Sequence, residues 1–305
     1  MSLYTKLDDT TIRQIAKQFD ISTIQTWKIL HGGVENTNHL LCTDSQKYVL
    51  TLCERKTAEE TTILANILEH LSEKKYPTSQ LIKNQSGASV SFYQNKPVLL
   101  KTYIEGNVKE AFDNALILKL GNKIAKLHQL SLPKNIPHQF SYGQQHFSEL
   151  YDSVKHPFVD WLQETHQYIL DNLLPSLPKA FIHGDIFTSN IVITTAAEPV
   201  IMDFEESCYY YRLFDLGMAI IGTCSDNAQL NANRIKALLQ GYQEENVLTA
   251  LEKKHFKAFV VYAATATAFW RFRQFNILAP IEDRKESYKE MQQLAIQAKQ
   301  MNFSL

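Results

Sequence analysis

Short apolar runs broken by turn-forming residues dominate the first third of the chain. Runs of this length, rich in β-branched and apolar residues, predict strands. They occur at residues 26–31, 38–43, 47–53, 88–94 and 97–104, with Asn95-Lys96 expected as the last turn. Two helices are expected in the same region, at residues 8–19 and 57–74. In the second, apolar residues recur every four positions, and Thr57 followed by Glu60 fits a capping box at its start.

Helical periodicity takes over after Gly106. Helices are expected at residues 111–130, 146–174 (interrupted by Pro157), 231–245, 250–276 and 284–300. Residues 180–204 are the exception, because they have the pattern of strand, loop, strand, turn and strand. We therefore expect an α+β protein of two lobes: a β-rich N-terminal lobe, residues 1–104, and a mainly helical C-terminal lobe, residues 105–305.

Composition narrows the class of protein without defining it. Of the 305 residues, 45% are hydrophobic and 21% charged, which is ordinary for a globular protein. Lys and Arg number 31 against 32 Asp and Glu, so neither nucleic acid nor a membrane surface is an expected partner. The four cysteines lack zinc-ligand spacing, and the N-terminus lacks an apolar signal core, so we expect a soluble, cytoplasmic protein. The sequence leaves the oligomeric state open.

The candidate chemistry lies in the strand-rich exception. The first strand leads into His183-Gly-Asp185, Asn190 follows, and the hairpin of the next two strands returns the chain to Asp203-Phe204. One end of the hairpin is thus expected to carry Asp185, Asn190 and Asp203 together. Protein kinases have the same His-x-Asp-x4-Asn spacing in their catalytic loop. The alternative interpretation is a surface turn, rich in Asp and Asn, that caps a hairpin.

Phosphoryl transfer from ATP requires such a group of residues. Magnesium must bridge the phosphates, and it prefers carboxylate and amide oxygens. Asp203 is the expected main metal ligand and Asn190 the second. Asp185 is then the catalytic residue that orients the attacking hydroxyl and accepts its proton, while positioning and charge stabilisation provide most of the rate.

Four segments resemble the aminoglycoside phosphotransferase and choline kinase superfamily, and most closely its kinase-like homoserine kinases. They are Gly33-Val-Glu-Asn36-Thr37-Asn38, Tyr48-Val-Leu-Thr51-Leu, His183 to Asn190, and Asp203-Phe-Glu205 with its continuation to Asp215 and Gly217. The resemblance covers nearly the whole chain and implies a bilobal protein-kinase-like fold. It also implies that Asp215, and His183 within the motif, support the catalytic loop structurally.

The nucleotide is expected at the first glycine-rich turn. Gly33 lets the backbone approach phosphate closely, and Asn36, Thr37 and Asn38 offer side-chain donors. An ordinary hairpin turn is the alternative. The resemblance adds Thr51 on the third strand and places adenine against residues 101–104, so Lys101 and Tyr103 are included.

Thr51 is also a departure from the superfamily pattern. Most members have Lys or Arg at this position to hold the α- and β-phosphates, whereas homoserine kinases of this type share the threonine. Arg55 and Lys56 are nearby in sequence as replacement cations, or are solvated surface charges. Glu60 either pairs with such a cation or serves only the capping box.

The acceptor pocket is the least defined part of the site. A carboxylate suits a bidentate arginine, and the candidates are Arg212, Arg271 and Arg273, whose alternative is packing beside core aromatic residues. Glu205 and Glu206 are candidate partners for an ammonium group. Tyr209, with Tyr210 and Tyr211, is a candidate aromatic wall. His128, at the end of an apolar stripe, is expected to be a packed histidine.

The interpretation favoured by these residues is an ATP- and Mg²⁺-dependent phosphotransferase that converts L-homoserine to O-phospho-L-homoserine, a step of threonine biosynthesis. Asp203 runs almost directly into Phe214-Asp215, which leaves no room for a protein-docking segment and favours a small acceptor. Choline, ethanolamine, an aminoglycoside or a sugar is the alternative acceptor. A nucleotide-binding pseudokinase module is the alternative of another class.

Overall fold

The computed structural model describes residues 5–30 and 36–303 of the chain. The chain forms two compact units, which are described separately here. Unit 1 comprises residues 1–105 and 133–135, and unit 2 comprises residues 106–132 and 136–305.

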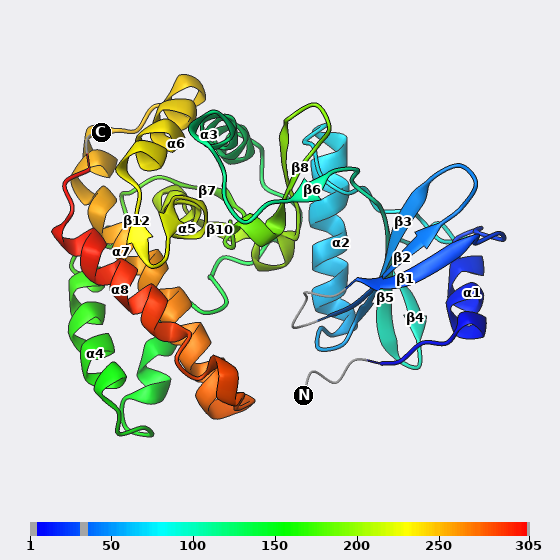
Figure 1. The fold of residues 1–305 in the computed structure, drawn as a ribbon, viewed down its shortest axis with the longest axis horizontal. Coiled ribbons are helices and arrows are strands. Elements are labelled where there is room, and N and C mark those ends of the chain that lie inside the picture. The colour runs from blue at the N-terminus through cyan, green and yellow to red at the C-terminus, as the bar shows by residue number, and fades with distance from the viewer. Residues whose placement is uncertain (1–4, 31–35, 304–305) are drawn as a thin grey trace. The chain divides into compact units, whose positions relative to one another are not determined.

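Unit 1 is built on a five-stranded antiparallel sheet with the order β1-β2-β3-β5-β4 (Figure 1). The strands are β1 (Thr26–Leu30), β2 (Asn36–Cys42), β3 (Lys47–Cys53), β4 (Ser91–Tyr93) and β5 (Lys96–Thr102). All five lie where the sequence predicts strands. The last turn is displaced by one residue from the prediction, because Gln94 and Asn95 adopt the positive φ angles of a tight hairpin.

Two helices cover opposite faces of this sheet (Figure 1). Helix α1 (Asp9–Lys17) buries Ile12, Ile15 and Ala16 in a core with apolar residues of β2, β3 and β5. Helix α2 (Ala58–Glu73) begins with the predicted capping box, in which the Thr57 hydroxyl accepts the Glu60 amide and the Glu60 carboxylate accepts the Thr57 amide. The Glu60 carboxylate therefore serves the cap.

Unit 2 is mainly helical. Its α-helices are α3 (Asn114–His128), α4 (Pro157–Leu170), α5 (Arg212–Thr223), α6 (Ala232–Glu245), α7 (Ala250–Phe272) and α8 (Tyr288–Gln300). Helix α7 is buried along most of its length and packs against α4, α5 and α8. Pro157 begins α4 rather than interrupting a helix, since proline needs no amide partner at a first helical position. The residues before it, Gln144–Leu150, form a separate 3-10 helix.

Short strands in unit 2 lie on either side of the loop that the sequence predicts to carry Asp185 and Asn190. Strands β6 (Asn107–Val108), β8 (Ile191–Ile193) and β9 (Pro199–Ile201) form one sheet, β7 (Lys179–Ile182) and β10 (Cys208–Tyr211) pair in another, and β11 (Ser225–Asp226) pairs with β12 (Gln229–Leu230). The sequence predicts β7, β8 and β9 but not β10. The pairing of β10 with β7 brings the segment that follows Asp203 back beside the segment that precedes His183.

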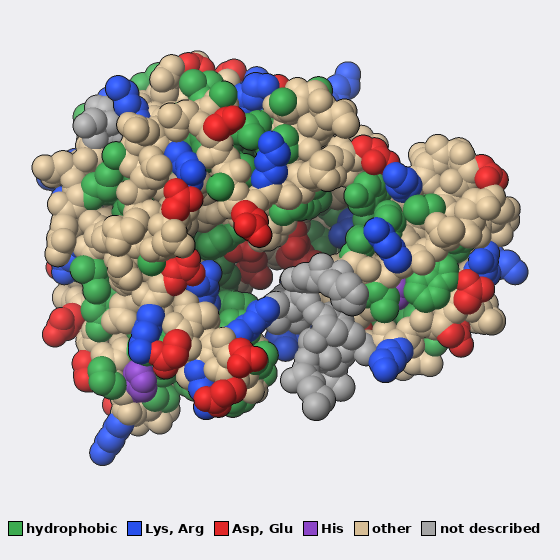
Figure 2. All heavy atoms as spheres, in the orientation of Figure 1, with side chains coloured by type: hydrophobic (Ala, Val, Ile, Leu, Met, Phe, Trp, Pro, Cys, Tyr) green, Lys and Arg blue, Asp and Glu red, His purple; other side chains and the backbone are tan. Residues whose placement is uncertain are grey.

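The molecular surface agrees with the near-zero formal charge. The visible face mixes basic and acidic side chains without a large region of one sign (Figure 2). Across residues 5–30 and 36–303, the helices all fall short of the length and apolar character needed to cross a membrane. The four cysteines are free thiols.

Candidate active site

Asp185 and Asn190 lie together in the loop that connects β7 to β8. The Asn190 side-chain nitrogen Nδ2 donates to the Asp185 carbonyl at 2.9 Å and to its carboxylate oxygen Oδ2 at 2.8 Å. A 3-10 turn at Thr188–Asn190 makes this geometry possible by folding Asn190 back towards Asp185. Because both bonds use Nδ2, the amide oxygen of Asn190 is the atom available to a metal ion.

Asp203 returns to the same end of the hairpin. The amide of Met202, the preceding residue, donates to the carbonyl of Asn190 at 2.8 Å. Asp203 itself is exposed and has φ 64° and ψ 63°. This left-handed conformation is uncommon for a residue other than glycine and is concentrated at functional sites.

The surroundings of Asp185 favour a carboxyl group that exchanges its proton near neutral pH. Burial raises the pKa of Asp185 to about 7, and the charges of Asp203 and Glu206 raise it further, while hydrogen bonds from Asn190 and Tyr142 oppose the shift. A group with such a pKa is suited to accept and release a proton.

Asp215 stabilises the catalytic loop by accepting hydrogen bonds from two of its backbone amides. It lies on α5, is fully buried, and accepts the amides of His183 at 3.0 Å and Gly184 at 2.8 Å. Its oxygen Oδ2 also lies 3.0 Å from Nε2 of His128. Burial alone would raise the pKa of Asp215, but the hydrogen bond and charge of His128, with those of His183, hold it below its ordinary value.

His183 is fixed in one neutral form by its neighbours. Its Nδ1 accepts the amide of Asp185 at 3.1 Å, so Nε2 carries the proton and donates to the carbonyl of Met202 at 2.8 Å. Burial lowers the pKa of His183 against the opposing charge of Asp215. The ring thus connects the Asp185 segment to the Asp203 segment.

Tyr142 was not selected from the sequence, and Glu206 and His128 have contacts in this site that the sequence does not indicate. Tyr142 donates its hydroxyl to Oδ1 of Asp185 at 3.4 Å, and Glu206 contributes charge beside the same carboxylate. His128 is packed, as expected, but it also bridges Asp215 and the Tyr242 hydroxyl, 3.0 Å from each. These contacts span more than 20 residues, and no local pattern of residues indicates them.

The predicted nucleotide residues of unit 1 fall on two faces of the sheet. Thr51 and Asn38 face each other in the register, and the Thr51 hydroxyl donates to Asn38 Oδ1 at 2.7 Å. Side chains alternate along a strand, so Asn36 lies on the face of Asn38, whereas Thr37 lies on the other. Gly33 lies outside the described residues.

The sequence predicts Thr37, like Asn36 and Asn38, as a side-chain donor to the nucleotide, but its side chain lies on the opposite face of the sheet from theirs. Its hydroxyl donates to Glu54 Oε1 at 2.6 Å. The amide and hydroxyl of Thr5 and the ammonium group of Lys96 donate to the same carboxylate. Glu54 thus joins the start of β2, the end of β3 and the segment before α1.

The other predicted residues of unit 1 lie in or after β5. Lys101 is partly buried and pairs with Val49 of β3. Tyr103 donates its amide to the carbonyl of Lys47, whose ammonium group lies 5.7 Å from the centre of the Tyr103 ring.

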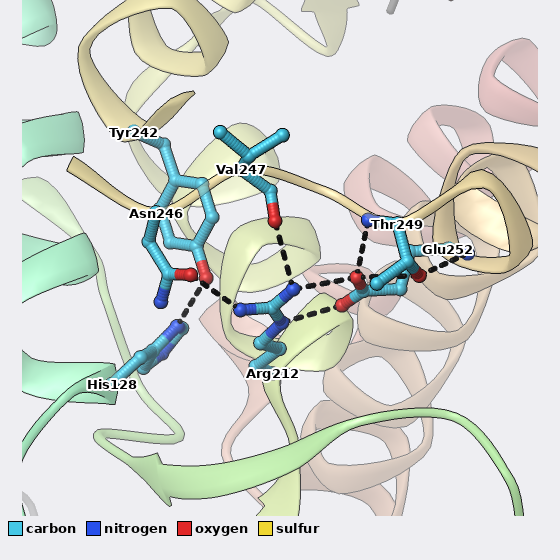
Figure 3. Close-up of polar contacts among 7 residues, drawn as sticks. All are labelled: His128, Arg212, Tyr242, Asn246, Val247, Thr249 and Glu252. Carbon is cyan, nitrogen blue, oxygen red and sulfur yellow. Dashed lines mark hydrogen bonds and ion pairs between the residues drawn. The ribbon is translucent and has the colours of Figure 1, made fainter. Parts of the chain in front are cut away.

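Arg212 is a correction to the predicted acceptor pocket. Its guanidinium group donates to both carboxylate oxygens of Glu252, to the Asn246 side chain at 2.6 Å and to the Val247 carbonyl at 3.1 Å (Figure 3). The Glu252 side chain is fully buried. The Arg212 guanidinium group is therefore fully engaged by contacts inside unit 2. The carboxylate of an acceptor could bind it only by displacing Glu252.

The other predicted acceptor residues differ in their surroundings. Arg271 donates to the Ser287 carbonyl and to Glu290 on α8. Tyr209 is partly buried, with its ring against His138. Glu205 follows Asp203 closely in the 3-10 turn Phe204–Glu206. Tyr210 and Tyr211, expected to extend the Tyr209 wall, are buried core residues.

The sheet unit and the loop of the helical unit together define the protein-kinase-like class of phosphotransferases. The chain belongs to the phosphotransferase enzyme family, whose model matches residues 26–250.

Relatives of this chain within the family include homoserine kinases. The chain is 26% identical to a homoserine kinase of Methylobacillus flagellatus over 292 residues, which cover 92% of this chain and 89% of that protein. It is 24% identical to a homoserine kinase of Pseudomonas aeruginosa, covering 90% and 88%.

Solved structures agree on the fold. An amicoumacin kinase superposes with a TM-score of 0.75 at 12% identity, covering 97% of this chain and 96% of that one. A microcompartment-associated aminopropanol kinase superposes with a TM-score of 0.74 at 15% identity, covering 96% and 97%. The predicted bilobal, protein-kinase-like α+β fold is thus confirmed.

Proposed function

We propose that this enzyme transfers the γ-phosphoryl group of ATP to the hydroxyl of L-homoserine, giving O-phospho-L-homoserine. The observation that carries the proposal is the Asp185 carboxylate, which Asn190 holds at the hairpin end where Asp203 returns. The homoserine kinases among the relatives, which match about nine-tenths of the chain, support the choice of acceptor.

Asp185 acts on the acceptor. Its carboxylate receives a hydrogen bond from the acceptor hydroxyl and takes the proton as the hydroxyl oxygen bonds to the γ-phosphorus. The bond from that phosphorus to the β,γ-bridging oxygen breaks, and ADP leaves. Asn190 holds this carboxylate in place for both the uptake and the later release of the proton.

Mg²⁺ fits the donors present. Asp203 offers an exposed carboxylate and Asn190 an amide oxygen, both of which are hard ligands that Mg²⁺ accepts. Within the described part of the chain, His, Cys, Asp and Glu side chains do not gather in threes or more to form a protein-only metal cage. Phosphate oxygens and water would therefore complete the coordination, as is usual for Mg²⁺ bound with a nucleotide. When bound, the ion neutralises phosphate charge.

We assign the nucleotide to unit 1 and the acceptor to unit 2, which follows the expected lobes 1–104 and 105–305. Asn36, Asn38 and Thr51 share one face of the sheet and supply polar groups, and Gly33, which precedes them in the sequence, is the proposed point of close backbone approach to phosphate. Thr37 contributes through its backbone, because its hydroxyl is engaged by Glu54. Lys101 and Tyr103 contact the adenine side, and the exposed Arg55 or its neighbour Lys56 provides the cation that Thr51 does not.

Glu205 and Glu206 receive the acceptor's ammonium group, with Tyr209 beside them. Arg271 is the candidate for the acceptor's carboxylate, because its ion pair with Glu290 is partly exposed and can be exchanged at lower cost than that of Arg212. The reaction belongs in the cytoplasm, where ATP is supplied and free thiols stay reduced.

The test is a panel of acceptors with purified protein, ATP and Mg²⁺, with ADP release measured in a coupled assay. L-homoserine is expected to give the highest kcat/KM among homoserine, choline, ethanolamine, an aminoglycoside and a sugar. A different best acceptor would replace homoserine, and nucleotide binding without turnover of any acceptor would favour a pseudokinase module.

Asp185→Asn tests the assigned chemistry. Loss of the proton acceptor is expected to lower kcat by about 100-fold or more while ATP binding, measured by calorimetry, is retained. Asp171→Asn is the matched control, because Asp171 is an exposed residue at the end of α4. Near-normal activity of Asp185→Asn would exclude Asp185 as the base.

A further inference from the structure

A segment that carries no recognisable motif lies along the catalytic loop. At its start, the Pro137 carbonyl accepts the amide of Tyr209 at 2.8 Å, and the His138 ring meets the Tyr209 ring. Residues 140–142 then each contact the catalytic loop or the Phe204–Glu206 turn beside it. We call residues 137–142 the flanking segment.

Each of these three residues reaches a different part of the site. Phe140 is fully buried, with its ring 4.6 Å from that of Phe214 and its edge against Gly184. The hydroxyl of the next residue, Ser141, donates to the Glu206 carboxylate. The hydroxyl of Tyr142 donates to Oδ1 of Asp185.

The two oxygens of the Asp185 carboxylate thus have different donors. Asn190 holds Oδ2 at 2.8 Å, and Tyr142 approaches Oδ1 at 3.4 Å. A single anchor leaves a carboxylate able to rotate about its Cβ–Cγ bond, whereas donors at both oxygens fix its plane. The longer bond is of the kind that shortens when the acceptor is bound.

The Tyr142 ring is itself fixed in place. Only 8% of the residue is exposed, and its ring centre lies 4.2 Å from that of Phe140 and 6.2 Å from that of Trp270. Trp270 lies near the end of α7, and the chain then continues as a π-helix, Arg273–Leu278, an irregularity frequent at functional sites. The hydroxyl is therefore held by packing that does not depend on Asp185.

We propose that Tyr142 is a positioning residue that orients the Asp185 carboxylate towards the acceptor hydroxyl, and that Trp270 holds the tyrosine ring for this task. The inference rests on the proposed function, since it assigns the orientation of the proposed base. A base that is rotated away from the acceptor proton slows the chemical step without changing the binding of either substrate.

Tyr142→Phe removes only the hydroxyl and keeps the ring against Phe140 and Trp270. With the acceptor that gives the highest turnover, kcat is expected to fall about tenfold, while the KM values for ATP and acceptor stay within about twofold. Tyr168→Phe is the matched control, because Tyr168 lies on α4 with Lys299 over its ring, and its kcat is expected to equal that of the wild type. Melting temperatures of both variants should match the wild type.

Crystal structures of the wild type and Tyr142→Phe provide a readout that needs no activity. Asp185 is expected to hold one rotamer in the wild type, and a second rotamer or a rotated carboxylate in the variant. Unchanged kcat together with an unchanged Asp185 rotamer would overturn the proposal, as would a loss confined to the acceptor KM. A wild type inactive on every acceptor would instead refute the proposed function, and the crystal structures would still decide the role of Tyr142.

Discussion

At the scale of single residues, the site depends on one position where the backbone excludes every side chain. Gly184 has φ 86°, and a Cβ atom there would lie 2.7 Å from the carbonyl oxygen of Glu206. A side chain at this position would therefore meet backbone as well as being strained by its own φ angle. The chain needs glycine here to bring the Asp185 segment against the Phe204–Glu206 turn.

Gly184→Ala is expected to destabilise unit 2 and to lower kcat by about 100-fold, because the loop that carries Asp185 must move away from Glu206. The measurements are chemical denaturation and ADP release. Gly87→Ala is a matched control, since Gly87 also has positive φ (82°) but, among the described residues other than Gly87 and its two chain neighbours, no atom lies within 4 Å of the added Cβ. Its cost is expected to be the strain alone, about 1 kcal/mol, with activity intact. Equal effects of the two substitutions would show that backbone strain, and not the Glu206 contact, explains Gly184.

At the scale of secondary-structure elements, local signals predicted more than long-range ones. The Thr57–Glu60 capping box, the β8–β9 hairpin and the return of Asp203 all depend on residues less than 20 positions apart. Turn residues, capping residues and hydrophobic periodicity indicate short-range features of this kind directly in the sequence.

Contacts between distant residues were missed for a physical reason. Tyr142 and Asp185 are 43 positions apart, and Arg212 and Glu252 are 40 apart. Whether an arginine meets a substrate or a buried glutamate is decided by the packing of α5 against α7, which residue types alone do not encode. The alternation of β2 likewise separates Thr37 from Asn38, although both residues suit a phosphate loop.

The Glu54 carboxylate gives a prediction at the same scale. It holds the hydroxyl of Thr37 at the start of β2 and the ammonium group of Lys96 at the start of β5. Because the proposed phosphate loop leads into β2, Glu54→Gln is expected to raise the KM for ATP several-fold with little change in kcat. Steady-state kinetics at varied ATP concentration measures this split.

Glu69→Gln is the control for that substitution. Glu69 also accepts a serine hydroxyl and lies 3.5 Å from a lysine, but it is on α2, and its contacts are with Ser89 and Lys83. Its KM for ATP is expected to match the wild type. If Glu54→Gln also leaves the KM for ATP unchanged, the Glu54 cluster only stabilises unit 1.

At the scale of the molecule, unit 2 combines its catalytic loop and its helix packing through α5. The first residue of α5, Arg212, binds Glu252 at the start of α7 and residues 246–247 after α6 (Figure 3). Asp215, on the same helix, accepts the amides of the catalytic loop. Loss of the Arg212–Glu252 pair is therefore expected to weaken the support of the loop as well as the packing of three helices.

Glu252→Gln leaves the Arg212 charge in a buried site without its full partner. The expected loss is about 3 kcal/mol of unfolding free energy, because breaking one side of a buried ion pair costs far more than breaking an exposed one. Glu290→Gln breaks the partly exposed pair with Arg271 and is expected to cost less than about 1 kcal/mol. Urea denaturation of both variants compares the two pairs, and similar losses would mean that burial does not set their strength.

The pH dependence of stability provides the last test of this pair. Burial alone would raise the pKa of Glu252, but the hydrogen bonds from Arg212 and Thr249 and the charge of Arg212 hold it below its ordinary value. A carboxyl whose pKa is lowered by folding stabilises the protein fully above its unfolded pKa, about 4.3, and this contribution is lost as the pH falls through the folded value. The gap in melting temperature between wild type and Glu252→Gln should therefore be constant from pH 8 to about 5 and narrow below about 4. A gap that stays constant at acid pH would mean that the charge of Glu252 contributes nothing and that only the shape of its side chain matters.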